Sequence, residues 1–185
     1  MRKLLLGIFL TATLMADAQE LPKAYNQLIK EVEAPMIQWR RHFHEFPELS
    51  NRETNTGKYI ADFLKTLPNV EVRYPVAKTG VVAVLKGGKP GATIALRADI
   101  DALPVYERTP VPFASKVTTE FNGQKVNVMH ACGHDSHTAM LMATAKVLST
   151  LQKDLPGTVV FLFQPAEEGP PANEEGGAPL MIKEG

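Results

Sequence analysis

The chain has 185 residues, of which 44% are apolar and 22% are charged, and its 20 basic side chains are balanced by 20 acidic ones. This length suits a single domain with a buried core. The balanced charge gives no indication of nucleic acid or of an anionic membrane surface as a partner.

The first residues have the pattern of a secretory signal peptide. Arg2 and Lys3 precede a short apolar run, and Ala16-Asp17-Ala18 has small residues at the spacing of a cleavage site. We expect residues 1–18 to be removed, and the mature chain from Gln19 onward to be periplasmic or secreted, with no membrane-spanning segment. The alternative is an N-terminal core helix, but such a helix would lack a polar face.

Two helices are expected in the first third of the chain. Apolar residues recur at helical spacing from 21 to 46, where Pro35 is expected to divide the stretch into two helical pieces and Pro47 to end it. A second helix is expected over 52–67, closed by Pro68.

The rest of the chain alternates strands with one further helix. Short β-type runs are predicted at 70–74, 80–87 and 93–99, with a Gly/Pro turn between the last two. Helical spacing returns after a natural N-cap at Asp135 or Ser136, and 158–164 reads as a strand buried on both faces. This order predicts an α/β layered domain with a mixed, partly parallel sheet.

Acidic residues follow two of the predicted strands. Asp99 and Asp101 end one, and Glu167 and Glu168 follow another. In open α/β sheets, ligands bind beyond the carboxyl ends of the strands. We therefore expect a functional site where these two strand ends meet.

Cys132 and His134 are candidate metal ligands in the loop before the last predicted helix. A thiolate, an imidazole and a carboxylate such as Glu168 would form a three-ligand zinc site with a position left for water. No second cysteine is present for a disulfide within the exported chain. The alternative is a buried cysteine beside histidines that are satisfied by hydrogen bonds.

The adjacent glutamates suit metal-assisted hydrolysis. In an extended segment their side chains point to opposite sides, so one can bind a metal while the other acts as a general base toward the metal's water. The alternative is a solvated acidic loop, which is also our interpretation of Glu174 and Glu175.

Other polar residues near the candidate site are expected to orient its ligands or to have structural roles. Asp101 could orient a ligand imidazole through a hydrogen bond, and Asp99 could do the same or pair with Arg97. His130 and His137 could support the site, or His137 could cap the helix start. Surface positions are expected for the last pair, His42 and His44.

Four sequence blocks resemble the metal-dependent N-acyl-amino-acid amidohydrolases, the hippurate hydrolase and auxin-conjugate hydrolase group of the aminoacylase and carboxypeptidase family. The blocks are RRHFHEFPELS, ALRADIDALPV, MHACGHDSHTAMLMATAKVL and VVFLFQPAEEG, in the family's order. The resemblance implies a three-layer, zinc-exopeptidase-like catalytic domain and hydrolysis of the amide bond of a small N-acyl amino acid.

The resemblance also implies roles for individual residues. Cys132, His134 and Glu168 would bind metal, Glu167 would be the general base, and Asp101 would orient the site. The implied cofactor is a pair of divalent ions, zinc or manganese. A thiolate favours zinc over magnesium or calcium, while manganese, cobalt and nickel stay open as alternatives.

The group's members are about twice as long, with further ligand histidines and a lid and dimerisation domain. All five histidines of this chain lie at or before position 137. We therefore expect 19–185 to be the N-terminal part of a truncated catalytic domain, with a homodimer only if the lid is present. Two alternatives remain: a catalytically incomplete metal-binding or interaction module, and a thiol hydrolase with Cys132 as nucleophile.

Overall fold

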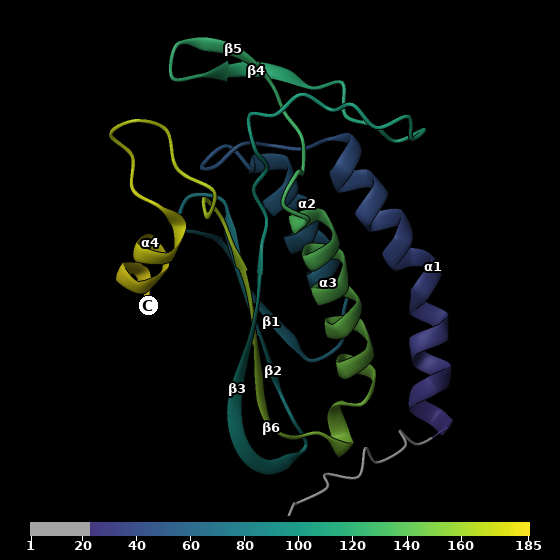
Figure 1. Cartoon of the computed structure of the whole chain (residues 1–185). Coiled ribbons are helices and arrows are strands. Elements are labelled where there is room, and N and C mark those ends of the chain that lie inside the picture. Colours follow the sequence, from purple (N-terminus) through teal and green to yellow (C-terminus); the bar gives the residue numbers. More distant parts are fainter. Residues whose placement is uncertain (1–22) are drawn as a thin grey trace, which may run out of the picture.

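A four-stranded sheet forms the centre of the structure, a computed structural model that describes residues 23–185 (Figure 1). In spatial order its strands are β1 (Val70–Val76), β2 (Gly80–Lys86), β6 (Pro156–Gln164) and β3 (Lys89–Asp99). β3 is parallel to β6, whereas the β1–β2 and β2–β6 pairs are antiparallel. The predicted mixed, partly parallel sheet is confirmed. The expected turn does join β2 to β3, but these strands are not paired because β6 lies between them.

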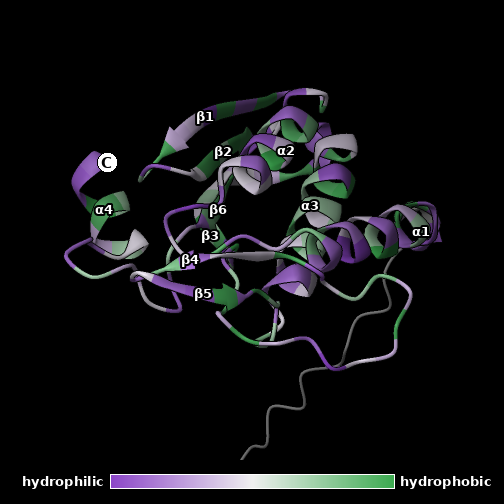
Figure 2. Cartoon of the chain, turned by 90° about the horizontal axis from the view of Figure 1, so that it is seen from above, coloured by the Kyte–Doolittle hydropathy of each residue, from purple (hydrophilic) through white to green (hydrophobic). Residues whose placement is uncertain are grey.

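Helices lie on both faces of the sheet, as Figures 1 and 2 show. One face is covered by α2 (Thr54–Lys65) and α3 (His134–Thr150), and α1 (Lys23–Glu45) packs on the outer side of α3. The short α4 (Gly177–Glu184) lies against the opposite face beside β6. A single 3₁₀ turn, Gln152–Asp154, links α3 to β6. The three layers of the expected fold are present, with α4 as the described part of the third.

The hydrophobic core lies between the sheet and the helices. Along β6, Val159, Phe161 and Phe163 are at most 2% exposed, and they belong to the main core cluster with residues of α2 and α3. Val160 and Leu162 alternate with them and are only half-buried, on the face that carries α4. The prediction of burial on both faces therefore holds fully for the helix-covered face and partly for the other, because α4 is short.

Helix α1 continues through Pro35, so the expected break does not occur. Proline removes the hydrogen bond to the carbonyl four residues earlier, which belongs to Glu31. Glu31 is exposed, so water can satisfy this carbonyl. The helix therefore tolerates the proline and ends at Glu45, as expected just before Pro47.

Helix α3 begins two residues earlier than an N-cap at Asp135 requires, and three residues earlier than one at Ser136. Gly133 is the N-cap, with a φ of 105° that a residue with a side chain rarely adopts, and His134 is the first helical residue. Asp135 and Ser136 lie inside the first turn, where the Asp135 carboxylate accepts a hydrogen bond from the Ser136 N–H. Cys132 lies in the preceding loop, as predicted, whereas His134 does not.

A hairpin that the sequence analysis missed covers one end of the domain. β4 (Thr118–Phe121) and β5 (Gln124–Asn127) are antiparallel and form a separate two-stranded sheet, drawn at the top of Figure 1. The turn residues Asn122 and Gly123 both have positive φ, 51° and 76°. Asn-Gly with this geometry is the preferred two-residue hairpin turn.

The predicted signal peptide, residues 1–18, lies outside the described residues. Among residues 23–185, no helix has both the length and the apolar composition needed to cross a bilayer.

Candidate metal centre

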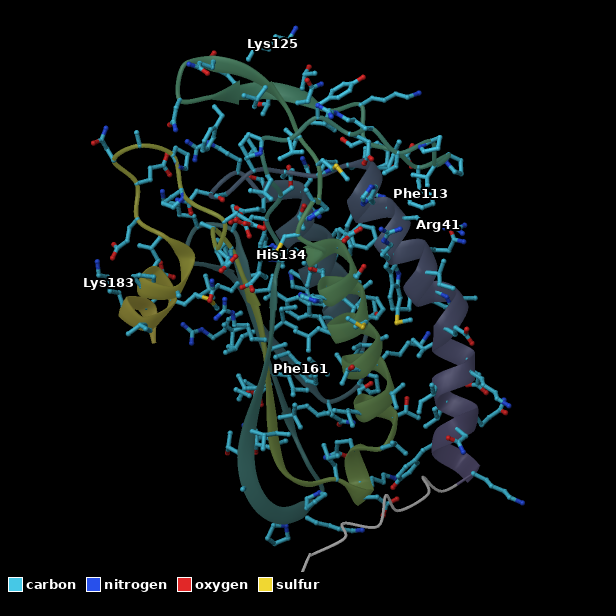
Figure 3. The ribbon with its side chains drawn as sticks, in the orientation of Figure 1. Arg41, Phe113, Lys125, His134, Phe161 and Lys183 are labelled. Atoms are coloured by element: carbon cyan, nitrogen blue, oxygen red, sulfur yellow. The ribbon has the colours of Figure 1, made fainter. Side chains whose placement is uncertain are left out.

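Three of the predicted site residues meet at the carboxyl ends of the parallel strands. Cys132, His134 and Glu168 each place a possible ligand atom within 4.8 Å of the others. Figure 3 shows His134 at the start of α3, beside the ends of the central strands. The loop before α3 and the loop after β6 thus bring together residues that are more than 30 positions apart in the sequence.

His134 is held by Asp101 on one side of its ring and faces the glutamates on the other. Its Nδ1 is 2.9 Å from the Asp101 backbone carbonyl oxygen and 3.4 Å from Asp101 Oδ1. Its Nε2 is 3.7 Å from Glu167 Oε2 and 3.8 Å from Glu168 Oε1. Burial lowers the pKa of His134, but the bonds to Asp101 outweigh burial and raise the pKa to about 9. The free protein therefore holds a cationic imidazole against three carboxylates, and a divalent cation could replace its proton.

Asp101 is a buried anchor for the site. Its Oδ2 accepts hydrogen bonds from the Ser50 hydroxyl at 2.6 Å and from the Glu168 backbone N–H at 2.9 Å. Burial raises the pKa of Asp101, but the nearby His134 ring and the hydrogen bonds from Ser50 and backbone N–H groups outweigh it and hold the pKa below its usual value. Asp101 contacts the His134 ring as expected for an orienting residue.

The two glutamates approach the site together, contrary to the expectation of opposite directions. Ala166, directly before them, has a left-handed φ of 47°, so the segment is not extended there. Both carboxylates come within 4 Å of His134 Nε2. The Glu168 side chain is 17% exposed and that of Glu167 is 40% exposed, so Glu167 lies on the solvent side.

The donor set fits a divalent metal. Among the described residues, the buried Glu168 Oε1 and Asp101 Oδ1 have no hydrogen-bond partner, and such orphaned acceptors are rare in folded proteins. The Glu168 carboxylate lies beside a thiol and an imidazole, which are zinc ligands. A cation between these groups would satisfy Glu168 Oε1 and bring the three side chains within bonding distance.

Cys132 is exposed and has the electrostatics of a protonated thiol in the free protein. A hydrogen bond to Glu168, together with burial and nearby carboxylates, raises the pKa of the thiol. A reactive nucleophilic cysteine needs the opposite, a lowered pKa. The surroundings of Cys132 therefore favour metal ligation, in which the ion displaces the thiol proton, over thiol catalysis.

Asp99 forms the predicted pair with Arg97 and also lies near His134. Its carboxylate pairs with Arg97 at 2.8 Å. It also forms a second group of possible ligands with His134 and Glu167, all within 4.8 Å of one another. The acidic side chains from the end of β3 are therefore on the same side of the sheet as the glutamates after β6.

The prediction of a surface position for His44 is wrong. His44 is 4% exposed, and its ring nitrogens lie 2.8 Å from Asp135 Oδ2 and 2.8 Å from Glu107 Oε2. Arg40 pairs with the same Asp135 oxygen at 2.8 Å. These hydrogen bonds and ion pairs connect the end of α1 to the first turn of α3. Close by, the guanidinium groups of Arg40 and Arg41 lie over the Phe113 ring (Figure 3).

The other histidines divide between buried and exposed positions. His130 is buried, its ring nitrogens have no partner among the described residues, and burial lowers its pKa to about 4. His137 is exposed, with its ring 6.1 Å from that of His134. His42 is half-buried and stacks on Tyr59.

Glu174 is more than a solvated loop residue. It pairs with Arg52 at 2.5 Å and with Lys78 at 2.6 Å, and these two hydrogen bonds lower its pKa to about 2. Asn51 donates a further hydrogen bond to its carboxylate. Glu175 pairs with Lys183 of α4. Ion pairs to three other parts of the chain therefore hold the loop after β6 in position.

Sequence reasoning missed Ser50 and Glu53, which support the site from the segment before α2. Ser50 binds Asp101, and the buried Glu53 binds the backbone beside Glu167. Burial raises the pKa of Glu53. Ser50 lies in one of the recognised blocks, but a serine or glutamate after a proline turn has no pattern that indicates such a contact.

A cavity of about 290 Å³ opens beside the cluster. Ser50, Leu103, Phe121 and Glu168 are among the residues that line it, so it extends from a candidate ligand to the β4–β5 hairpin. Its size suits part of a small organic molecule.

Known proteins resemble this chain in both sequence and structure. The profile of "Peptidase family M20/M25/M40" matches residues 95–185. An N-acyl-L-amino acid amidohydrolase of Geobacillus stearothermophilus is 45% identical over 160 residues, which are 86% of this chain and 40% of that protein. The chain thus spans about two-fifths of the length of the curated relatives it matches.

Two solved structures of similar proteins also align with this chain. The structure assigned to an aminohydrolase of methicillin-resistant Staphylococcus aureus aligns with a TM-score of 0.77 and 43% identity, over 89% of this chain and 39% of that one. A dinuclear metal-binding peptidase of family M20 from Bacillus subtilis aligns with a TM-score of 0.66 and 47% identity, over 75% and 36% of the two chains. The predicted resemblance is confirmed: residues 95–185 match the peptidase family M20/M25/M40, and the similarity to the amidohydrolase and to the family M20 peptidase extends over most of the chain.

Proposed function

We propose that this chain supplies metal ligands to an enzyme, and that this enzyme hydrolyses the amide bond of small N-acyl amino acids. Cys132, His134 and Glu168 are the metal ligands in this proposal, Glu167 is the general base, and Asp101 orients His134. The observation that carries it is the buried, unpaired Glu168 Oε1, within 4.8 Å of a thiol and an imidazole.

A bound divalent ion would acidify a water molecule and polarise the substrate carbonyl. Zinc is the proposed ion because the set contains a thiolate, and manganese is the second choice. Asp99, whose carboxylate lies within 4.8 Å of a ring nitrogen of His134, is the proposed ligand for a second ion nearby. The similar Bacillus subtilis peptidase is itself a dinuclear metal-binding protein.

In this proposal Glu167 moves a proton between water and the leaving nitrogen. Its carboxylate reaches the cluster from the solvent side and is 40% exposed, so it can receive a proton without being a ligand. The Asp101 backbone carbonyl and carboxylate hold the Nδ1 side of His134, which leaves Nε2 for the metal. The raised pKa of Cys132 speaks against the thiol-hydrolase alternative.

The substrate class rests on the relatives and on the cavity. The Geobacillus relative is an N-acyl-L-amino acid amidohydrolase, and the cavity beside Glu168 is sized for a small acyl or side-chain group. We also propose that the protein is exported, because its first 18 residues have the pattern of a signal peptide.

Metal analysis and a base variant test the proposal. The purified chain should bind zinc, and Glu167→Gln should keep zinc while losing hydrolysis of an N-acetyl amino acid panel by about 10²-fold or more. Unchanged hydrolysis by Glu167→Gln, or activity that survives chelation but not iodoacetamide, would contradict it. Zinc binding with hydrolysis only in a longer chain that supplies further ligands would assign the 185-residue chain to the metal-binding, non-catalytic class.

A further inference from the structure

A fully buried carboxyl group lies behind the two glutamates and takes no part in the cluster. Glu53 is 0% exposed and directly precedes α2. Its Oε1 accepts a hydrogen bond from the Ala166 backbone N–H at 2.8 Å, and its Oε2 accepts one from the Thr79 hydroxyl at 2.7 Å. A carboxyl group is expensive to bury unless such bonds compensate, so its two partners indicate what it does.

The first partner, Ala166, has an unusual backbone conformation. Its φ of 47° lies in the left-handed region, which is unfavourable for residues with a Cβ atom. Such a conformation persists when the surroundings hold it. Glu53 binds the N–H of Ala166, and the Gly177 N–H binds its carbonyl at 3.2 Å. Both sides of the residue are therefore fixed.

Gly177 completes the turn by close contact. A Cβ atom on Gly177 would lie 1.7 Å from the Pro165 carbonyl oxygen, so only glycine fits there. The loop after β6 therefore closes on its own start, with Ala166 at the point of closure and only 3% exposed.

The turn determines where the next two side chains go. After Ala166, both Glu167 and Glu168 come within 4 Å of His134 Nε2. The left-handed Ala166 changes the direction of the chain as it leaves β6. The segment that carries both glutamates is thereby turned toward the start of α3, where their carboxylates meet the His134 ring.

We propose that Glu53 is a positioning residue, whose hydrogen bond to the Ala166 N–H holds the left-handed turn and so aims both glutamates at the metal cluster. The expected effect of Glu53 on zinc affinity rests on the proposed metal function. Its effect on the conformation of Ala166 rests only on the observed hydrogen bond between the two residues.

A matched pair of variants separates the hydrogen bond from side-chain volume. Glu53→Gln keeps an acceptor for Ala166 and an amide that can donate to Thr79, whereas Glu53→Met has similar length and no acceptor. With zinc as the probe, in competition with a chromophoric chelator, Glu53→Met should weaken binding about 10–100-fold, as for other supporting residues of metal sites. Glu53→Gln should stay within about threefold of the wild type.

Thr79→Val supplies the control, because it removes the other partner of Glu53 and leaves the Ala166 bond. It is expected to lower the melting temperature with little change in zinc affinity. If Thr79→Val weakens zinc binding as much as Glu53→Met does, or if Glu53→Gln is as weak as Glu53→Met, the proposal is overturned. Wild-type affinity in Glu53→Met also overturns it.

Hydrogen exchange gives a readout that needs no metal. Amide exchange in a peptide covering 164–168 should be faster in Glu53→Met than in Glu53→Gln or Thr79→Val. If the wild-type chain binds no zinc, the proposed function fails, and this comparison alone decides the role of Glu53. Equal exchange in all three variants rejects that role.

Ala166→Gly tests the coupling between the two residues. Glycine adopts the left-handed turn without help, so Glu53→Met should cost less zinc affinity and less protection from exchange in the Ala166→Gly background. Should Glu53→Met fail to fold, recovery of folding in that background supports the proposal, and continued failure there contradicts it.

Discussion

His134 and Glu168 face each other across the candidate metal centre, but different kinds of structure hold them. His134 begins a long helix that packs on the hydrophobic core, and Asp101 binds its ring from behind. Glu168 lies on a loop whose position depends on individual polar contacts, among them the ion pairs of Glu174. One side of the site is thus fixed by packing, and the other by hydrogen bonds and charges.

This difference has a consequence for how the two sides respond to change. Packing against a core is insensitive to pH and salt, whereas exposed ion pairs are weakened by both. We expect the loop side to loosen first under acid, high salt or substitution. The helix side should persist until the domain unfolds.

Asp101→Ala should have the largest effect, because Asp101 contacts both sides. It removes the acceptor for the Ser50 hydroxyl and the Glu168 N–H, as well as the carboxylate beside His134. The free energy of unfolding should fall by about 3 kcal/mol, measured by urea denaturation, since buried partners are left unpaired. Zinc affinity should fall about 10–100-fold.

Asp99→Ala is the matched control for that variant. Asp99 is two residues away and pairs with the half-exposed Arg97. Its loss should lower the free energy of unfolding by less than about 1 kcal/mol. Equal losses for the two aspartates would show that Asp101 has no special place in the site.

Glu174→Gln should have an intermediate effect that depends on pH. Its partners lower the pKa of Glu174 from 4.5 to about 2. A carboxyl whose folded-state pKa is lowered stabilises the fold above its unfolded pKa, and this contribution disappears as the pH falls toward the folded pKa. The melting temperature of Glu174→Gln should therefore be below that of the wild type at pH 7, and the difference should shrink between pH 4.5 and pH 2. A difference that does not vary with pH would mean that the ion pairs do not hold the loop.

Cys132→Ser should have the smallest effect on stability, although Cys132 is a proposed ligand. Cys132 is exposed and lies in a loop, so the free energy of unfolding of the metal-free protein should stay within about 0.5 kcal/mol of the wild type. Zinc affinity should fall sharply. A large loss of stability without metal would assign Cys132 a structural role instead.

The sequence was most informative where a residue type has one main use. The Cys132 and His134 pair, and the glutamates after an apolar strand, predicted the cluster from residue type and position alone. These side chains lie close together because the parallel strands β3 and β6 bring their carboxyl ends to the same edge of the sheet. The order of the other helices and strands likewise followed from the periodicity of the apolar residues, whereas β4, β5 and α4 were not predicted.

Apart from the local β4–β5 hairpin, the misses concern residues whose partners are far away in the sequence. His44 was expected at the surface, but its partners are 63 and 91 positions away. Glu53 is 113 positions from Ala166, and no local pattern reports such a contact. Pro35 and the left-handed Ala166 break local preferences, which only the surrounding structure could reveal.

X-ray absorption spectroscopy of the zinc-loaded chain tests the proposed metal centre most directly. A Cys132, His134 and Glu168 site predicts one sulfur neighbour at about 2.3 Å and nitrogen or oxygen neighbours at about 2.0–2.2 Å from zinc. The sulfur neighbour should vanish in Cys132→Ser, while the nitrogen and oxygen neighbours remain. A zinc spectrum without sulfur in the wild-type chain would contradict the proposed site.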